Sequence, residues 1–466
     1  MKTHSRTIGL ALAGTCLVLA VSGCDSLIDD FANGIEQDPN HTVENLSPED
    51  YRQHGQLFVA DLHTDTMLWN RDIMRRNGRG HLDLPRMKAG NIRLQVFIAV
   101  TKTPPAKKET RKNAQGDDSE VTCVYADDIN LTGLLAVVQL RDPETWFDLE
   151  ARALLQARRL QRFELESLRR NAKDPSYPEL RIIRTLDDLR YVMAQAATGE
   201  RHVVGAVLGL EGVHWLGEEG LSEREIEAGV QRLYQAGFRL LAPTHRFHNG
   251  LGGSSEGCDP IEEEDYLTDA GGIVLRKAEA LGMVIDLAHA HSKTITKAQS
   301  VVAGPLFVSH TGTQEACRKY APDCDVNRNL TDEDIVRLAQ MGGVIGIGFW
   351  PQAVGPGAEP IVETMSHIAT TLQEAKQAGK LSGDPCEHIA FGSDFDGAVH
   401  TPFDAAGLAL LTKAMRDAVS DGKSEPQCFD EENIRKIAGG NVCRVLATRL
   451  GASGVTEADA ICQSVL

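Results

Sequence analysis

The sequence predicts a (β/α)8 TIM-like barrel with an insertion between the second and third strands. Eight short apolar runs rich in β-branched residues recur along the chain, segments with helical spacing separate them, and several runs end on a histidine or an acidic residue. The runs occupy residues 57–63, 92–100, 203–211, 238–245, 283–289, 306–310, 343–349 and 388–394. Strands and helices that alternate eight times are typical of this barrel. A doubly wound open sheet is the main alternative.

Signals for helix ends lie between these runs. Ser222 and Glu225 form a capping-box pattern ahead of a helical segment, and Gly237 suits its C-terminus. Gly282 is expected to end the helix before the fifth strand. Pro85 lies near the start of another helix, where its missing N–H is tolerated. Each segment is long enough to cross back over a parallel sheet.

The second and third runs are separated by about 100 residues, more than a simple crossover needs. This part of the chain holds a polar stretch near 103–122 and a strongly charged helical segment at roughly 142–171. We therefore expect an insertion over one side of the barrel mouth.

The first 23 residues are typical of an export signal. Lys2 and Arg6 precede an uncharged stretch from Thr7 to Val21, which is too short for a membrane-spanning helix. The stretch ends on VSGC, which resembles the lipobox of bacterial lipoproteins and would make Cys24 the lipid-modified first residue. An ordinary cleaved signal peptide is the alternative, and both interpretations export the protein.

The net charge argues against nucleic-acid binding. Loss of the signal takes away two basic residues and no acidic one, so the formal charge changes from −18 to −20. Without Cys16 and Cys24, eight cysteines remain, an even number compatible with disulfides in an oxidising compartment. Pairs that could close or join loops are Cys317 with Cys324 and Cys123 with Cys258. Free buried thiols are the alternative.

Five residues with metal-binding side chains stand at the same end of the apolar runs. They are His63, Asp65, Glu211, His289 and His310. A closed parallel barrel brings the carboxyl ends of its strands together, so residues far apart in sequence meet at one mouth. His63 and Asp65 can point the same way, because residues two apart in a strand share a face. The pattern predicts a metal centre.

Glu211 is the residue that most needs a cation. No basic residue adjoins it, and an unpaired buried carboxylate is costly. Two divalent cations would resolve this, because one carboxylate has two oxygens and can bridge them. The alternatives are a salt bridge from Glu211 to an arginine of another loop and, for His289 and His310, structural roles in hydrogen bonds.

The motifs HTD, LEG, APTH, IDLAH, VSH, RN and GSDFDG, in this order, resemble those of the renal (membrane) dipeptidase family of the amidohydrolase superfamily. The resemblance covers residues 57 to 446. It implies a (β/α)8 barrel with two Zn²⁺ ions, one held by His63 and Asp65, the other by His289 and His310, with Glu211 bridging. Mn²⁺ or Co²⁺ could substitute, since imidazole and carboxylate donors suit all three metals.

The resemblance also assigns three residues that handle substrate and protons. His245 would polarise the scissile carbonyl and steady the oxyanion, and Arg328 would receive the terminal carboxylate of the substrate. Asp394 would move protons. Asp396, two residues on, could face the same way, and Asp394 is preferred because it is closer to the strand end.

These assignments predict that the protein is a binuclear metal-dependent dipeptidase. A hydroxide that bridges two zinc ions would hydrolyse the peptide bond of a dipeptide. A related amidohydrolase acting on N-acyl amino acids or cyclic amides is one alternative. A lipoprotein that binds metal or peptide without catalysis is another. No GxSxG nucleophile elbow or Walker-type loop ends a strand, which argues against serine hydrolases and phosphate chemistry.

The chain is expected to comprise a lipoprotein signal peptide (1–23), an acidic tether (24–50), the metallohydrolase barrel (51–450) and a C-terminal tail (451–466). The mature protein would be attached to a membrane through Cys24 and face the periplasm or the cell exterior. The sequence leaves the oligomeric state open, with a homodimer among the arrangements.

Overall fold

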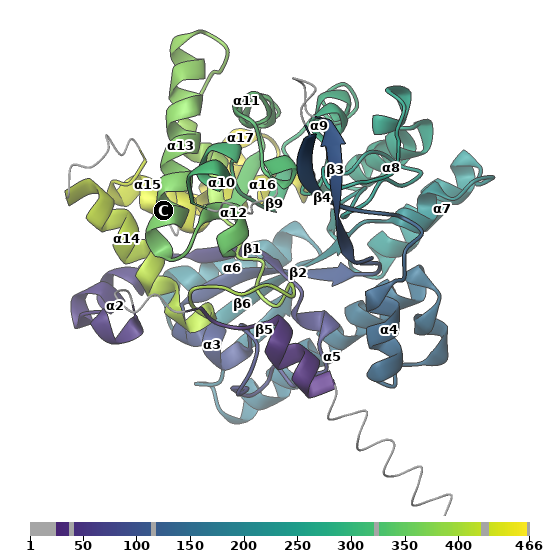
Figure 1. The fold of residues 1–466 in the computed structure, drawn as a ribbon. Coiled ribbons are helices and arrows are strands. Elements are labelled where there is room, and N and C mark those ends of the chain that lie inside the picture. Colours follow the sequence, from purple (N-terminus) through teal and green to yellow (C-terminus); the bar gives the residue numbers. More distant parts are fainter. Residues whose placement is uncertain (1–24, 37–41, 113–117, 321–325, 421–427, 464–466) are drawn as a thin grey trace, which may run out of the picture.

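The computed structural model describes residues 25–36, 42–112, 118–320, 326–420 and 428–463 (Figure 1). The expected signal peptide and Cys24 lie outside the described residues, as does Cys324. In the part of the chain that is described, no helix has the length and apolar character needed to cross a bilayer.

The eight predicted strands are all present and parallel to their neighbours. They are β1 (Val59–Thr64), β2 (Ile92–Val100), β6 (Val203–Glu211), β7 (Leu240–Leu241), β8 (Val284–Ile285), β9 (Phe307–Thr311), β10 (Val344–Ile347) and β11 (Ile389–Phe391). All residues of β1 and β6 are buried, as expected for strands covered on both faces.

Strand pairing follows the order of a barrel. One sheet has the order β5-β6-β2-β1-β11-β10-β9, and β7 pairs with β8. Single parallel bridges connect the two sheets, from Leu208 to Phe238, from Glu211 to Ala242 and from Asp286 to Phe307. The described strands therefore follow one another around a TIM-like α/β fold, with single bridges rather than continuous ladders at two of the junctions.

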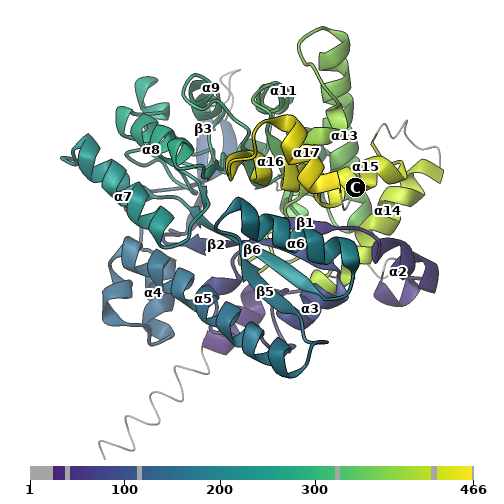
Figure 2. The same ribbon diagram turned by 180° about the vertical axis from the view of Figure 1, so that it is seen from behind.

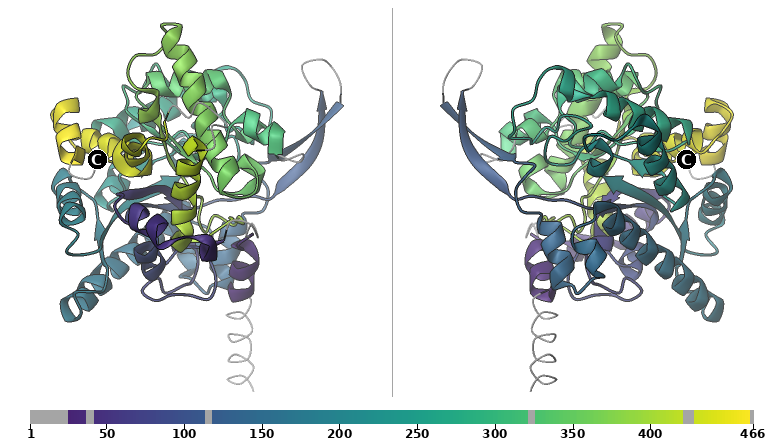
Figure 3. Two further views of the ribbon diagram at one scale, coloured as in Figure 1. Left: turned by 90° about the vertical axis from the view of Figure 1, so that its left-hand side faces the viewer. Right: turned by 90° about the vertical axis from the view of Figure 1, so that its right-hand side faces the viewer.

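The segment between β2 and β6 is an insertion, as predicted, but it contains more regular structure than the sequence indicated. Its polar stretch forms a hairpin of β3 (Ala106–Lys112) and β4 (Asp118–Val124), which extends away from the barrel (Figure 3). Helices α4 (Leu131–Val138) and α5 (Leu149–Lys173) follow. An unpredicted strand, β5 (Glu179–Ile182), then pairs with the first half of β6. Among the described strands β5 pairs only with β6, and side chains of α5 accept hydrogen bonds from its backbone, from Leu180 N–H to Ser167 Oγ and from Ile182 N–H to Glu164 Oε1. Local sequence does not reveal these contacts.

Helices surround the sheet on its outer side (Figures 1 and 2). They are α2 (Pro48–His54), α3 (Leu84–Ala89), α6 (Leu186–Thr198), α7 (Glu223–Gln235), α8 (Asp269–Ala280), α9 (Ser292–Ala298), α10 (Gln314–Tyr320), α11 (Asp332–Gln340), α12 (Pro351–Val354), α13 (Ala358–Gln377), α14 (Leu408–Ser420), α15 (Glu431–Arg435), α16 (Asn441–Arg449) and α17 (Val455–Cys462). The predicted capping box of Ser222 and Glu225 begins α7, and Gly237 and Gly282 adopt left-handed φ angles of 105° and 74° beyond α7 and α8.

The two ends of the described chain pack against the barrel. Residues 25–32, which fall in the expected tether, form a helix that we name the N-terminal helix. The expected tail forms α17, which the Cys443–Cys462 disulfide joins to α16. Asp29 of the N-terminal helix pairs with Arg71, and Glu457 of α17 pairs with Arg190, and composition alone does not show these distant partners.

Disulfides confirm one of the expected cysteine pairs. Cys123 is bonded to Cys258 and so joins the β4 end of the hairpin to the loop after β7. Cys386–Cys428 is a further disulfide, and Cys317 is disulfide-bonded as well. Disulfides of this kind form in oxidising compartments, as expected from the even number of cysteines.

Candidate metal centre

The predicted ligands meet at the carboxyl ends of the strands. His63 is in β1 and Asp65 follows it, Glu211 ends β6, His310 is in β9, and His289 follows β8 by four residues. Each is at most 7% exposed. The structure therefore brings together five side chains that the sequence spreads over about 250 positions.

Glu211 lies in the middle of this group. Its Oε1 is 3.0 Å from Nε2 of His289 and 3.6 Å from Nε2 of His310. The Nε2 atoms of these two histidines are 3.0 Å apart. On the other side, Nε2 of His63 is 3.4 Å from Oδ1 of Asp65.

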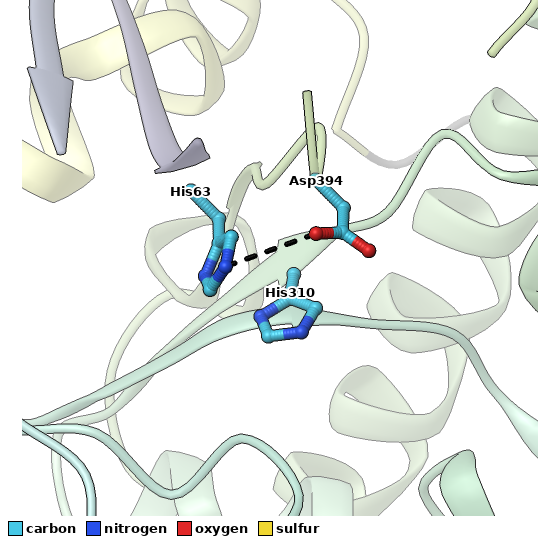
Figure 4. Close-up of side chains that lie close together, drawn as sticks. All are labelled: His63, His310 and Asp394. Atoms are coloured by element: carbon cyan, nitrogen blue, oxygen red, sulfur yellow. Dashed lines mark ion pairs between the residues drawn. The ribbon is translucent and has the colours of Figure 1, made fainter. Parts of the chain in front are cut away.

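Ligand atoms within 4.8 Å of one another form three overlapping sets. The first is His63, Asp65 and Glu211, the second is Glu211, His289 and His310, and the third is His63, His310 and Asp394. Glu211 belongs to two sets, each of which has the nitrogen and oxygen donors that divalent transition metals bind. Figure 4 shows the third set, in which Nε2 of His63 and Oδ1 of Asp394 are 3.8 Å apart.

Three atoms in this centre lack the hydrogen bonds that buried polar atoms need. They are His63 Nε2, Asp65 Oδ1 and Glu211 Oε1, and beyond the close imidazole–carboxylate contacts given above none forms a hydrogen bond among the described residues. Buried polar atoms are almost always satisfied, so a converging group of unsatisfied ligand atoms is suited to bind a cation. The residues therefore fit a divalent metal.

The electrostatics of the centre agree with this conclusion. Burial raises the pKa of Glu211 and of Asp65 well above the usual carboxyl range, and the nearby charge of Asp396 adds to the effect on Asp65. Burial also lowers the pKa of His289 and His310 well below that of a free imidazole. Burial thus favours the neutral forms of these carboxyl and imidazole groups. A bound metal ion would favour the charged carboxylates and lower their pKa values.

Two residues that the sequence analysis missed orient the histidines. The Oγ of Ser309 lies 3.0 Å from Nδ1 of both His63 and His310, and Oε2 of Glu256 lies 2.5 Å from Nδ1 of His289. Because these contacts occupy the Nδ1 atoms, the Nε2 atom of each histidine remains available to bind a metal ion. In metal sites a second polar group commonly fixes the imidazole ring in this way. Ser309 could have been suspected from its place in VSH, whereas no sequence signal marks Glu256, which comes from the loop after β7.

His245 was predicted to contact substrate, and its ring lies against the centre. Its Nε2 is 3.2 Å from Oε2 of Glu211, and its Nδ1 is 3.0 Å from the carbonyl oxygen of Lys102. A carbonyl only accepts, so Nδ1 carries the hydrogen. Burial lowers the pKa of His245 to about 3, which makes the imidazole neutral at pH 7.

Arg328 also reaches the centre, in the 3-10 turn η6 (Val326–Arg328). Its Nη2 donates to the carbonyl oxygen of His310 at 2.9 Å and lies 3.3 Å from Nε2 of His289. Its guanidinium is 5.6 Å from the ring centroid of Trp350, within range of a cation–π contact. The side chain predicted from the resemblance alone therefore adjoins the metal-binding group.

The loop after β11 contains two buried aspartates with different surroundings. Asp394 faces His63, and burial raises its pKa to about 8. Asp396 points away, where it forms an ion pair with Arg71 at 2.6 Å and accepts hydrogen bonds from Thr66 Oγ1 and the His81 backbone N–H. Although burial opposes it, the charge of Arg71 lowers the pKa of Asp396. Of the two, Asp394 is the one placed at the centre.

His289 and Asp394 both have left-handed backbone conformations, with φ angles of 61° and 62°. Such angles are strained for residues other than glycine and concentrate at functional sites. In the described chain, both residues use this conformation just beyond the strand end to turn the side chain toward the centre.

These features define a class of protein: a TIM-like barrel whose strand ends carry a candidate centre for divalent metal ions. The chain belongs to the membrane dipeptidase family (peptidase family M19), because the model of that family matches residues 52–454. The match confirms the resemblance seen in the motifs.

Individual relatives agree with this membership. The dipeptidase aclJ of Aspergillus oryzae is 26% identical over 247 residues, which are 52% of this chain and 51% of that protein. The chain thus spans about half the length of this curated relative.

Solved structures show the same fold. A metallopeptidase described as dipeptidase AC has a TM-score of 0.55 at 21% identity, covering 86% of this chain and 99% of that chain. A metallopeptidase from Rhodobacter sphaeroides, liganded with a phosphinate mimic of the dipeptide L-Ala-D-Ala, has a TM-score of 0.54 at 20% identity, covering 88% and 99%.

Proposed function

We propose that this protein hydrolyses dipeptides at a binuclear metal centre, with zinc as the native metal. The observation that carries the proposal is the set of buried unpaired atoms of His63, Asp65 and Glu211, with Glu211 shared between two ligand sets. His63 and Asp65 would hold one ion, His289 and His310 the other, and Glu211 both. A metal pair of this kind supplies Lewis acidity, which lowers the pKa of water toward neutrality and polarises a carbonyl oxygen.

Asp394 is suited to move the proton of the attacking water. It is buried beside His63, and its pKa of about 8 without metal shows that its environment tolerates the protonated form. A carboxyl that accepts a proton near neutral pH can return it to the leaving amine. Asp396 cannot take this role, because Arg71, Thr66 and His81 occupy its oxygens.

His245 is suited to stabilise negative charge on the substrate oxygen. Its Nδ1–H is held by Lys102, so Nε2 becomes a donor only when it takes up a proton. Negative charge that develops on the carbonyl oxygen favours this protonation, because an opposite charge raises the pKa of an imidazole. His245 would therefore interact more strongly with the transition state than with the substrate.

Arg328 is suited to bind the carboxylate of the second residue of a dipeptide. A guanidinium presents paired N–H donors that match a carboxylate, and that of Arg328 lies 5.6 Å from the ring centroid of Trp350. A longer peptide would place its terminal carboxylate farther from the metal ligands, so Arg328 would select short substrates. The dipeptide mimic bound by the Rhodobacter sphaeroides metallopeptidase and the name of the Aspergillus oryzae relative support the same substrate class.

The proposal is tested by metal analysis together with a substrate panel. We expect two equivalents of zinc per chain and hydrolysis of dipeptides with a free amino terminus. N-acyl amino acids and cyclic amides serve as the comparison substrates. Equal turnover of substrates that lack the free amine would contradict the dipeptidase assignment, and metal binding without any turnover would identify a binding protein.

We further propose that the protein is exported and attached to a membrane through a lipid on Cys24, facing the periplasm or the cell exterior. The VSGC motif and the uncharged stretch before it support this proposal. Cys24→Ser should abolish incorporation of a labelled fatty acid, whereas Cys16→Ser, a matched change within the expected signal, should not. Equal labelling of both variants would contradict lipidation at Cys24.

A further inference from the structure

The N-terminal helix has its polar side turned toward the barrel and its apolar side turned toward solvent. Asp25, Asp29 and Asn33 recur at helical spacing and are at most 4% exposed. On the opposite side, Leu27 is 71% exposed and Phe31 is 84% exposed. A helix on the surface of a soluble domain normally shows the reverse pattern.

Ion pairs explain why the polar side of this helix is buried. Oδ2 of Asp29 lies 3.1 Å from Nε of Arg71 and 3.0 Å from Nε of Arg79. Asn33 donates to Asp29 and accepts from the backbone N–H of Ala398. The helix is therefore fixed to the loops after β1 and β11, and its apolar side is held outward.

Helix α4 presents a second apolar stripe to solvent. Leu131, Leu134 and Val137 of the helix, and Leu140 just after its end, are 36% to 55% exposed. Side chains three residues apart on a helix are neighbours, so the three helical residues form one stripe. Leu135 and Ala136, on the other side, are buried. Both sides of this helix are thus apolar, which is unusual for a helix with one side in water.

The N-terminal helix and the end of α4 lie next to each other. Gln139, which caps α4, donates from Nε2 to Oδ1 of Asp25 at 2.9 Å. Figures 1 and 3 show the purple N-terminal helix beside the blue α4. We name the surface formed by Leu27, Phe31, Leu131, Leu134, Val137 and Leu140 the apolar face.

We propose that the apolar face docks onto the surface of a lipid bilayer. The proposal rests on the lipid attachment proposed for Cys24, because that residue directly precedes the N-terminal helix, which begins at residue 25. Lipid attached at this position would hold the apolar face within reach of the acyl–headgroup boundary, where exposed leucine and phenylalanine side chains are stabilised.

Docking through the apolar face also orients the barrel mouth. Arg71 contacts both Asp29 of the N-terminal helix and Asp396, which is two residues from Asp394. Helix α4 belongs to the segment that follows β2, at the same end of the barrel as the candidate metal centre. The bound protein would therefore hold its metal-binding end beside the bilayer surface rather than pointing freely away from it.

Tryptophan substitutions in the full chain test the proposal. Phe31→Trp and Leu134→Trp place a fluorophore on the apolar face, and Val419→Trp on α14, 46% exposed, is the matched control. Vesicles of phosphatidylethanolamine and phosphatidylglycerol with brominated acyl chains serve as the probe. We expect extra quenching and a blue shift, relative to the unsubstituted chain, for the two face variants and not for Val419→Trp.

Two outcomes would overturn the proposal. One is equal quenching of all three variants, and the other is a blue shift of the face variants that needs a high protein concentration instead of vesicles, which would indicate contact between two copies of the chain. Dipeptide hydrolysis is measured on the same samples in detergent. Its loss in every sample would contradict the proposed function while leaving the quenching result intact, and active samples without quenching would contradict docking alone.

Discussion

Two aspartates in one loop show how different partners give buried carboxylates different roles. Asp394 and Asp396 lie two residues apart, both are at most 8% exposed, and both have left-handed backbone angles. Asp396 has Arg71 as its counter-ion, and its pKa is lowered, although burial acts against this. Among the described residues no arginine or lysine forms an ion pair with Asp394, and burial raises its pKa to about 8.

The same contrast separates two regions of the barrel mouth. The first region, which we name the rim, comprises Asp29, Arg71 and Asp396, and there Arg71 forms ion pairs with both aspartates. In the centre, Glu211 and Asp65 have unpaired oxygens. A buried charge that the protein neutralises supports the fold, whereas converging charges that it leaves unneutralised mark a place for a ligand.

The largest effect is expected for Glu211→Gln. The amide keeps the size of the side chain but loses the charge that both ligand sets share, so bound metal and dipeptide hydrolysis should both disappear. Metal per chain and turnover are the measurements. The metal-free variant should not unfold at a lower temperature than the metal-free parent, since burial disfavours the charge of Glu211 there. Two retained metal ions would show that Glu211 does not bridge.

Asp394→Asn should lower kcat by about 10²- to 10⁴-fold, the usual contribution of a group that transfers protons. Most of the bound metal should remain, because two of the three ligand sets do not include Asp394. The ratio of turnover to bound metal is the measurement that separates this variant from Glu211→Gln. Turnover close to that of the parent would assign proton transfer to another group.

Asp396→Asn is the matched control for Asp394→Asn and should act mainly on stability. Loss of one partner of a buried ion pair costs about 3–5 kcal/mol, so the thermal midpoint should fall clearly. Asp394→Asn should not lower that midpoint at pH 7, because burial disfavours the charge of Asp394. Similar midpoints for the two variants would contradict the contrast between rim and centre.

Glu256→Gln should weaken metal binding by about 10- to 100-fold, which is typical for a residue that orients a ligand. The change removes the charge that contacts Nδ1 of His289 and leaves all direct ligands in place. Competition with a chelator measures the affinity. Glu263→Gln, on the exposed ion pair with Lys293, is a control that should leave the affinity unchanged.

The smallest effect concerns the pH dependence of the metal-free protein. Asp394 has a raised folded-state pKa, from 3.8 to about 8, so its protonated form stabilises the fold at low pH and this contribution is lost as pH rises through that window. Asp394→Asn does not titrate. The thermal midpoint of the variant should therefore rise relative to that of the parent between about pH 4 and pH 8, and added metal should reduce the difference. If the difference in thermal midpoint between variant and parent stays constant with pH, Asp394 does not have a raised pKa in the metal-free protein.

Much of the fold could be predicted from the sequence, because the signals for it are local. Each of the eight strands is an apolar run, and the helix ends carry capping residues such as Ser222. The insertion was placed correctly, but β5 within it was missed. A four-residue strand that pairs only with β6 has no periodicity long enough to detect.

The ligand residues could also be predicted, because a metal centre at a barrel mouth requires histidines and carboxylates at strand ends. The residues that orient these ligands from distant loops could not be predicted. Glu256 reaches His289 from a loop that the Cys123–Cys258 disulfide joins to the hairpin, and the expected tether is fixed in part by Asp29 and Arg71. These contacts join residues dozens to hundreds of positions apart, and no local pattern records them.

The sequence by itself determined the strands, the donor types at their ends and the family, since these depend on residue identity and short-range spacing. The sequence favoured Asp394 over Asp396 by its place near the strand end, but only the tertiary structure shows that Asp394 faces the centre and that Arg71 neutralises Asp396. It also decided that the N-terminal helix turns its apolar side outward. Charge pairing and burial are properties of the space around a side chain, and that space is created by segments that are distant in the sequence.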